Sequence, residues 1–233
     1  MSQPTSYDLV LSSGFLAFAR HVGVLRALEQ RGLAIDGITG TSSGALVGAL
    51  WAAGLSSHAV EALLTAMPPW KLLRLHAQPW RGLLDTSAFA EFLRPHLPAT
   101  FADLRHPLAV GVVDARGQHR LLTSGPLTEA VVASCAMPYA FRPVQVAGES
   151  FADGGAADRL ALGAWRQLRP GRQAIAHQVQ RSAGVDVPLD LTNVALIRTP
   201  RSGASFLTLG DFAAQVAEAL DCASQVLDGI TAG

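Results

Sequence analysis

The spacing of apolar and polar positions divides the chain into short apolar runs and longer amphipathic runs. Apolar runs of a few residues between turn formers are typical of buried strands, whereas apolar positions three or four residues apart are typical of helices. The runs of strand type are residues 7–11, 35–39, 108–113, 118–122, 174–180 and 194–198, with two short runs between 143 and 155. The runs of helix type are residues 18–31, 45–53, 57–67, 86–97, 127–135, 160–168 and 212–227.

The order of these runs predicts the fold class. The first fifty or so residues contain two consecutive units of strand, small-residue loop and helix. Such units normally place their strands parallel in one sheet, joined by crossover helices. Arg116 and Gly117 instead form a turn between two runs of strand type, which predicts a hairpin. We therefore expect an α/β fold around a mostly parallel sheet.

Composition narrows the picture further. The chain has 233 residues, of which 49% are hydrophobic, and this is enough to bury a sizeable core. Residues 1–233 are therefore expected to form a single domain. Eighteen basic and eighteen acidic residues give no net charge, so no global field favours nucleic acid. Cys135 and Cys222 lie in apolar runs and predict buried thiols rather than a disulfide or metal site.

The location expected from the sequence is the cytoplasm. The polar N-terminus lacks the layout of a secretory signal, and no apolar run reaches the roughly 18 residues of a membrane span. Export by a route that needs no such signal stays open, as does the oligomeric state.

Residues 70–80 differ in kind, because tryptophans and leucines alternate there with Lys71, Arg74 and His76. A surface helix packed on the core is the usual origin of such a pattern. The other interpretation is a flap over an apolar pocket, or a segment in transient contact with a membrane interface.

The candidate chemistry begins at Gly40-Thr41-Ser42-Ser43-Gly44, which follows a strand and precedes a helix. Gly-x-Ser-x-Gly in this context is typical of a nucleophile elbow, in which a sharp turn lifts the serine hydroxyl out of the backbone. Gly40 and Gly44 would permit that turn, because glycine tolerates strained dihedrals and close packing. Ser42 is therefore the expected nucleophile.

A second candidate is Asp153, which ends a short strand and is followed by Gly154 and Gly155. A carboxylate at a strand end can point into a cleft, although the same residues also suit an ordinary Asp-Gly turn.

Four features stand in one order along the chain: a strand and small-residue loop at residues 11–15, the elbow, the run 134–138 and the Asp-Gly-Gly motif. Together, from about residue 7 to residue 160, they resemble the patatin-like phospholipase family. The resemblance implies a three-layer α/β/α fold and a Ser-Asp dyad that hydrolyses acyl esters of lipids, without histidine, metal or cofactor. Ser42 would be the nucleophile and Asp153 its base.

The loop after the first strand departs from the family pattern. Family members usually carry Gly-Gly-Gly-x-Arg/Lys-Gly, whereas residues 13–18 read Ser-Gly-Phe-Leu-Ala-Phe. The backbone N–H groups of Ser13, Gly14 and Phe15 would have to form the oxyanion hole. Arg20 is the expected substitute for the cation that the family carries at the position of Ala17. The altered loop leaves a second interpretation open, a weak or inactive relative that binds lipid or acyl groups.

The side chains of this loop also bear on the substrate. Phe15, Leu16 and Phe18 predict a more apolar pocket mouth than is usual in the family, which favours neutral or short acyl esters.

A Ser-His-Asp hydrolase is the remaining alternative, since His177 follows Asp153. It is disfavoured because the elbow comes after only two strands and because His177 falls in an expected strand. His21, near the proposed oxyanion loop, is expected to cap or pack a helix rather than to act in catalysis.

Overall fold

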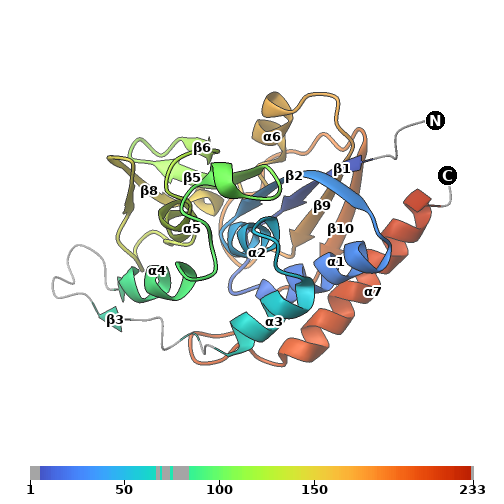
Figure 1. Ribbon diagram of the computed structural model, residues 1–233, viewed down its shortest axis with the longest axis horizontal. Coiled ribbons are helices and arrows are strands. Elements are labelled where there is room, and N and C mark those ends of the chain that lie inside the picture. The colour runs from blue at the N-terminus through green and yellow to red at the C-terminus, as the bar shows by residue number, and fades with distance from the viewer. Residues whose placement is uncertain (1–5, 67–68, 70–73, 76–83, 232–233) are drawn as a thin grey trace.

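The central element of the fold is an eight-stranded sheet (Figure 1). The structure is a computed structural model that describes residues 6–66, 69, 74–75 and 84–231. The strands of the sheet are β1 (Ser6–Leu11), β2 (Ala34–Thr41), β5 (Leu108–Asp114), β6 (His119–Leu122), β7 (Val144–Val146), β8 (Glu149–Asp153), β9 (Ala174–Val179) and β10 (Val194–Thr199). The helices are α1 (Phe18–Gln30), α2 (Ser43–Ala52), α3 (Ser57–Thr65), α4 (Ser87–Leu93), α5 (Leu127–Ser134), α6 (Leu162–Leu168) and α7 (Phe212–Thr231).

The strand order is β10-β9-β1-β2-β5-β8-β7, with β6 also paired to β5. The five strands from β10 to β5 run parallel to one another, while β6 and β8 pair with β5 in the antiparallel sense and β7 pairs likewise with β8. The predicted mostly parallel sheet is confirmed. Because the strands are parallel, the ends of β1, β2 and β9 lie along one edge of the sheet, where the loops that follow them meet.

Alternate residues along the strands enter two separate cores. In β1, Leu9 and Leu11 belong to the large core under α1, α2, α5 and α7, whereas Val10 belongs to a smaller core with Trp165 of α6. This alternation is the side-chain period of an extended strand that is covered on both faces. Helices thus lie on both sides of the sheet (Figure 1), which confirms the three-layer α/β/α architecture.

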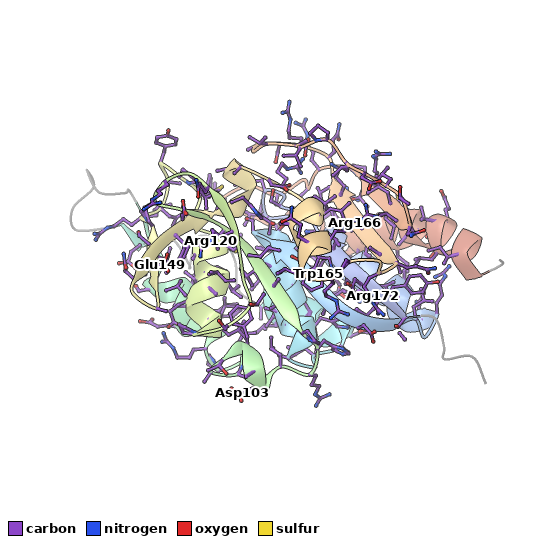
Figure 2. The ribbon with its side chains drawn as sticks, turned by 90° about the horizontal axis from the view of Figure 1, so that it is seen from above. Asp103, Arg120, Glu149, Trp165, Arg166 and Arg172 are labelled. Carbon is purple, nitrogen blue, oxygen red and sulfur yellow. The ribbon has the colours of Figure 1, made fainter. Side chains whose placement is uncertain are left out.

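A buried carboxylate holds α6 against the sheet. Asp8 of β1 is 1% exposed and accepts hydrogen bonds from Trp165 Nε1 at 3.0 Å and Arg169 Nε at 2.9 Å. Trp165 of α6 and nearby Arg172 are labelled in Figure 2, and Arg172 Nε is 3.6 Å from the second Asp8 oxygen. A buried charge needs such partners to be tolerated, so this thin helical layer depends on Asp8.

The predicted elements are all present, with three differences in detail. The helix α4 ends at Leu93 rather than near residue 97, because Pro95 has no N–H with which to continue the helical hydrogen bonds. The helix α7 continues to Thr231 rather than ending near residue 227, and α3 ends at Thr65 rather than near residue 67. Ser56 caps α3 by accepting the Ala59 N–H. The amphipathic stretch 70–80 lies outside the described residues except for 74–75. No helix in the described ranges is long and apolar enough to cross a membrane.

Gly23 sets the approach of α1 to α7 and generates the first prediction. A Cβ at Gly23 would lie 2.4 Å from the Val216 carbonyl oxygen and 2.7 Å from the Ala219 Cβ, both on α7. Gly23→Ala should therefore force the helices apart and lower the free energy of unfolding by about 1–3 kcal/mol in urea denaturation. Gly163→Ala on α6, where a Cβ would meet nothing within 4 Å, is the matched control and should raise it by up to about 1 kcal/mol. Equal effects of the two substitutions would contradict this account.

Candidate active site

Ser42 occupies the turn between β2 and α2 with a strained backbone. Its φ of 54° and ψ of −118° lie in a region that L-residues rarely adopt. The flanking glycines permit this turn by letting backbones touch: a Cβ at Gly40 would lie 2.5 Å from the Gly44 carbonyl, and a Cβ at Gly44 would lie 2.4 Å from the Leu11 oxygen. Gly40 and Gly44 thus allow the backbones around Ser42 to pack closely.

The hydroxyl of Ser42 is not used to cap α2, although Ser42 stands at the N-cap position. Its backbone N–H donates to Ser134 Oγ at 2.8 Å, and Ser134 Oγ donates to the Gly111 carbonyl at 2.6 Å. Ser134 thereby ties the elbow to β5 and leaves the Ser42 side chain free to turn toward Asp153. The sequence marked Ser134 only as part of a motif, because its partners are 92 and 23 residues away.

Asp153 ends β8, which pairs with β5 and delivers the carboxylate to the elbow. Its side chain is 6% exposed and accepts the Gly155 N–H at 2.8 Å. Burial raises the pKa of Asp153 to about 6, while hydrogen bonds from the Ser42 side chain and the Gly155 N–H oppose the rise. Ser42 and Asp153, 111 positions apart in the sequence, are thus brought together.

The two glycines after Asp153 allow this loop to reach the elbow. A Cβ at Gly154 would lie 2.5 Å from the Gly111 backbone, and a Cβ at Gly155 would lie 2.6 Å from Ser13 Oγ. Gly154 and Gly155 are therefore required by close packing, which an isolated Asp-Gly turn would not explain.

Cys135 also faces the site but does not compete with Ser42 as a nucleophile. Its thiol donates to the Ser42 carbonyl oxygen at 3.4 Å. Burial, with a smaller contribution from the Asp153 charge, raises the pKa of the Cys135 thiol well above its usual range. The thiol is consequently protonated at neutral pH.

The loop after β1 lies next to this pair but departs from one expectation. The Ser13 N–H donates to the Arg159 carbonyl at 2.7 Å, so the prediction that it serves an oxyanion hole is wrong. Within the described residues, the N–H groups of Gly14 and Phe15 donate to no protein acceptor, and both residues line the cavity beside Ser42. These two groups remain candidates for the oxyanion hole.

The arginine that contacts this loop is Arg159 and not the predicted Arg20. Arg20 faces α7, where it pairs with Glu218 and donates to the carbonyls of Gln215 and Arg201, so its predicted role at the loop is wrong. Arg159 instead donates to Ser13 Oγ at 3.3 Å and to the Ser13 carbonyl at 2.9 Å. No sequence motif singled out Arg159, because it lies 146 residues from its partner.

The two histidines near the elbow form a buried pair. Their Nδ1 atoms are 2.9 Å apart, and the remaining ring nitrogens contact Ser43 Oγ for His21 and Thr199 Oγ1 for His177. Burial lowers the pKa of His21 to about 3 and lowers the pKa of His177 well below its usual value. Both rings are therefore neutral at pH 7. Packing is confirmed for His21, but it caps no helix, and His177 has its expected place inside a strand.

A cavity of about 450 Å³ opens beside Ser42 and Asp153. Its walls are mostly apolar and come from the loop after β1, from α2, α3 and α4, and from the segment after α5. The apolar side chains of the wall include Phe15, Leu16, Phe18, Leu46, Leu64, Phe89, Phe92, Met137, Phe206 and Leu209. An apolar ligand is the kind that this cavity could hold.

No group of three or more His, Cys, Asp or Glu side chains in the described part of the chain is arranged to hold a metal ion. The polar groups beside the cavity are instead a hydroxyl bonded to a carboxylate of raised pKa, next to backbone N–H donors. This arrangement can remove a proton from Ser42 as the oxygen attacks an electrophile.

Comparison with known proteins agrees with these features. The family model described as patatin-like phospholipase matches residues 9–164. An uncharacterized NTE family protein of Mycobacterium bovis is 35% identical over 158 residues, which cover 66% of this chain and 44% of that protein. Neuropathy target esterase sws of Drosophila melanogaster is 27% identical over 197 residues, or 81% of this chain and 14% of that protein. The chain thus spans less than half the length of these curated relatives.

Solved structures share the fold at lower identity. The crystal structure of VipD from Legionella pneumophila superposes with a TM-score of 0.63 and 15% identity, covering 98% of this chain and 68% of that one. The type III effector protein ExoU superposes with a TM-score of 0.52 and 16% identity, covering 98% and 54%.

The raised pKa of Asp153 predicts a specific pH dependence of stability. Between about pH 4 and pH 6 the folded protein holds a proton that the unfolded chain has released, so stability falls as pH rises through this window. Asp153→Asn stays neutral at every pH, and its free energy of unfolding should exceed that of wild type by up to roughly 3 kcal/mol at pH 7 but by little at pH 4. Urea unfolding at pH 4, 5, 6 and 7 measures the difference.

Asp36 supplies a control of opposite sign. Chiefly because Ser6 donates a hydrogen bond to it, the pKa of Asp36 is lowered. Asp36→Asn should therefore lose stability relative to wild type as pH rises. A pH-independent difference for Asp153→Asn would contradict the raised pKa.

Proposed function

Since the chain belongs to the patatin-like phospholipase family, we propose that it is a lipid acyl hydrolase of the phospholipase A or esterase type. The observation that supports this most directly is the hydrogen-bonded pair of Ser42 and the buried carboxylate of Asp153 at the mouth of an apolar cavity.

In the proposed first step, Ser42 Oγ attacks the ester carbonyl carbon while its proton passes to Asp153. An exposed aspartate of ordinary pKa is a poor base at pH 7. Burial raises the pKa of Asp153 to about 6, so it is mostly ionised at pH 7 yet binds a proton more readily. The ester C–O bond then breaks, the alcohol leaves with that proton, and an acyl group remains on Ser42.

In the second step, water attacks the acyl-enzyme and Asp153 accepts the water proton. The fatty acid leaves, and the proton returns to Ser42 Oγ. In both steps the carbonyl oxygen becomes negative, and the Gly14 and Phe15 N–H groups would stabilise that charge.

The cavity supports an acyl chain as the group bound. At roughly 30 Å³ for each water-sized or methylene-sized group, a volume of about 450 Å³ holds on the order of fifteen such groups. We therefore propose neutral esters with acyl chains of medium length, longer than the short chains that the loop sequence by itself favours.

The rim of the cavity supports contact with a lipid aggregate. Tyr139 and Phe206 line the cavity and are 96% and 42% exposed, and adjacent Leu207 is 75% exposed. Apolar and aromatic side chains at an opening are suited to a membrane interface. Transient membrane contact at this rim is therefore part of the proposal.

A lipid-binding protein without turnover is the competing function. The unusual side chains of residues 13–18 favour it, whereas the strained elbow at Ser42 and the costly burial of Asp153 have no purpose in simple binding. Hydrolysis is therefore the proposal that accounts for more of the structure.

Hydrolysis of p-nitrophenyl octanoate tests the dyad. Wild type should turn over, and Ser42→Ala and Asp153→Asn should each lower kcat by at least about a thousandfold, because nucleophile and base act as one unit. Ser43→Ala, which removes the neighbouring hydroxyl, is the matched control and should remain within about tenfold of wild type. Circular dichroism establishes that each variant is folded. An inert wild type that fails to react with a fluorophosphonate would favour the binding protein.

A series of p-nitrophenyl esters from four to twelve carbons tests the acyl cavity. Each methylene buried is worth about 0.8 kcal/mol, so kcat/KM should rise by up to about fourfold per carbon until the cavity is filled. Phe92→Ala removes an aromatic ring from the wall and enlarges the cavity, so it should shift the preferred acyl-chain length upward. A flat profile across the series would show that the acyl chain does not enter this cavity.

A further inference from the structure

Arg159 is an almost fully buried cation beside the proposed site, with 1% of its side chain exposed. Its guanidinium donates to the Ser13 carbonyl at 2.9 Å, to Ser13 Oγ at 3.3 Å, to the Val179 carbonyl at 2.7 Å and to Asp186 Oδ1 at 2.8 Å. Burying a charge is costly without such partners, so these acceptors keep the cation in place.

Ser13 is held by Arg159 through all of its polar atoms. The Ser13 N–H donates to the Arg159 carbonyl at 2.7 Å, while its carbonyl and hydroxyl accept from the guanidinium. The Ser13 carbonyl and the Gly14 N–H belong to one planar trans peptide group and point in opposite directions. The bond from Arg159 to this carbonyl therefore turns the Gly14 N–H to the side away from Arg159.

The next peptide group is oriented in a similar way. The Ala17 N–H donates to the Gly14 carbonyl at 3.3 Å, and that carbonyl shares a peptide plane with the Phe15 N–H. Ser202 Oγ in turn donates to the Phe15 carbonyl. Both N–H groups proposed for the oxyanion hole thus have their directions set by hydrogen bonds to the carbonyl of the preceding residue.

We propose that Arg159 is the positioning residue of the oxyanion hole, acting through the Ser13–Gly14 peptide group. The inference rests on the proposed hydrolase function and deepens it. A cation on the Ser13 carbonyl also polarises the peptide group, which makes the Gly14 N–H a stronger donor to developing negative charge. Arg159 thereby supports, from 146 residues away, a loop that has no cation of its own between residues 12 and 18.

Asp186 extends this arrangement to another part of the cavity wall. The Arg159 N–H donates to the Val185 carbonyl at 2.9 Å, and the Val185 N–H donates to the Gly155 carbonyl at 2.9 Å. Asp186 therefore orients the guanidinium from a segment that is itself bonded to the Asp-Gly-Gly loop. Residues 182–184 of the same segment line the cavity.

The test compares Arg159→Lys and Asp186→Asn with wild type, using p-nitrophenyl octanoate as substrate. Lysine keeps the charge but cannot contact the same set of acceptors, so Arg159→Lys should lower kcat by about tenfold to a hundredfold with KM changed by less than about threefold. Asp186→Asn keeps the guanidinium and should give a smaller loss of kcat in the same direction.

A second readout separates positioning of the oxyanion from general damage. Ser42 Oγ adds to the carbonyl carbon of 1,1,1-trifluoro-2-decanone, its proton passes to Asp153, and the ketone oxygen becomes an oxyanion. The inhibition constant of this ketone should rise in Arg159→Lys by the same factor as kcat falls. Inhibition by 1-octanol, a neutral ligand that has no carbonyl or anionic oxygen, should be unchanged.

Arg20→Lys is the matched control, because Arg20 is also buried and also donates to one carboxylate and two carbonyls, but on α7. It should leave kcat and ketone inhibition unchanged. Folded Arg159→Lys with wild-type kcat and ketone inhibition, or with ketone and 1-octanol inhibition weakened equally, would overturn the proposal. If wild type itself neither hydrolyses the ester nor binds the ketone, the proposed function fails, and this inference fails with it.

Discussion

The close approach of the α2 backbone to the ends of β1 and β2 is the contact on which the rest of the site depends. It requires glycine at positions 40 and 44, where any side chain would collide with main-chain atoms of Gly44 or Leu11. The approach forces Ser42 into a strained conformation and prevents its hydroxyl from capping the helix. Strain of this kind persists only where the surroundings over-determine it. Here Ser134 supplies one such restraint, by bonding the Ser42 N–H and the Gly111 carbonyl together.

The same strand edge concentrates polar groups that are expensive to bury. Asp153, Arg159 and the His21–His177 pair are all nearly inaccessible to solvent, and each has partners from distant parts of the chain, which for Asp153 is the Ser42 side chain. The histidines are neutral and serve packing, whereas the carboxylate is mostly charged at pH 7 and costs stability there. Buried polar groups that reduce stability are typical of functional sites rather than of structural cores. Asp153 and the two histidines are buried to a similar extent, and they differ in their protonation states and in their hydrogen-bond partners.

Much of the fold and part of the site could be predicted from the sequence, because those features are local. Two strand–loop–helix units follow from hydrophobic spacing, and the elbow and the Asp-Gly-Gly motif follow from residues that are adjacent in the chain. The loop after β1 was only partly predictable. Which of its N–H groups stay free depends on Arg159, because the Arg159 carbonyl accepts the Ser13 N–H. Arg20 was the wrong cation because α1 directs its side chain toward α7.

The sequence by itself determined the order of elements, the strained turn at Ser42 and the residues proposed to carry acyl-transfer chemistry, since turn geometry and side-chain chemistry depend on a few neighbouring residues. Only the tertiary structure decided that Asp153 reaches Ser42, that its burial raises its pKa, and that Arg159 holds the Ser13 carbonyl. The physical reason is that desolvation and hydrogen-bond pairing depend on what packs around a group, and here the partners are about 100 to 150 residues away. The pattern of neighbouring residues does not reveal contacts between residues so far apart in the chain. The packing of the sheet brings those residues together.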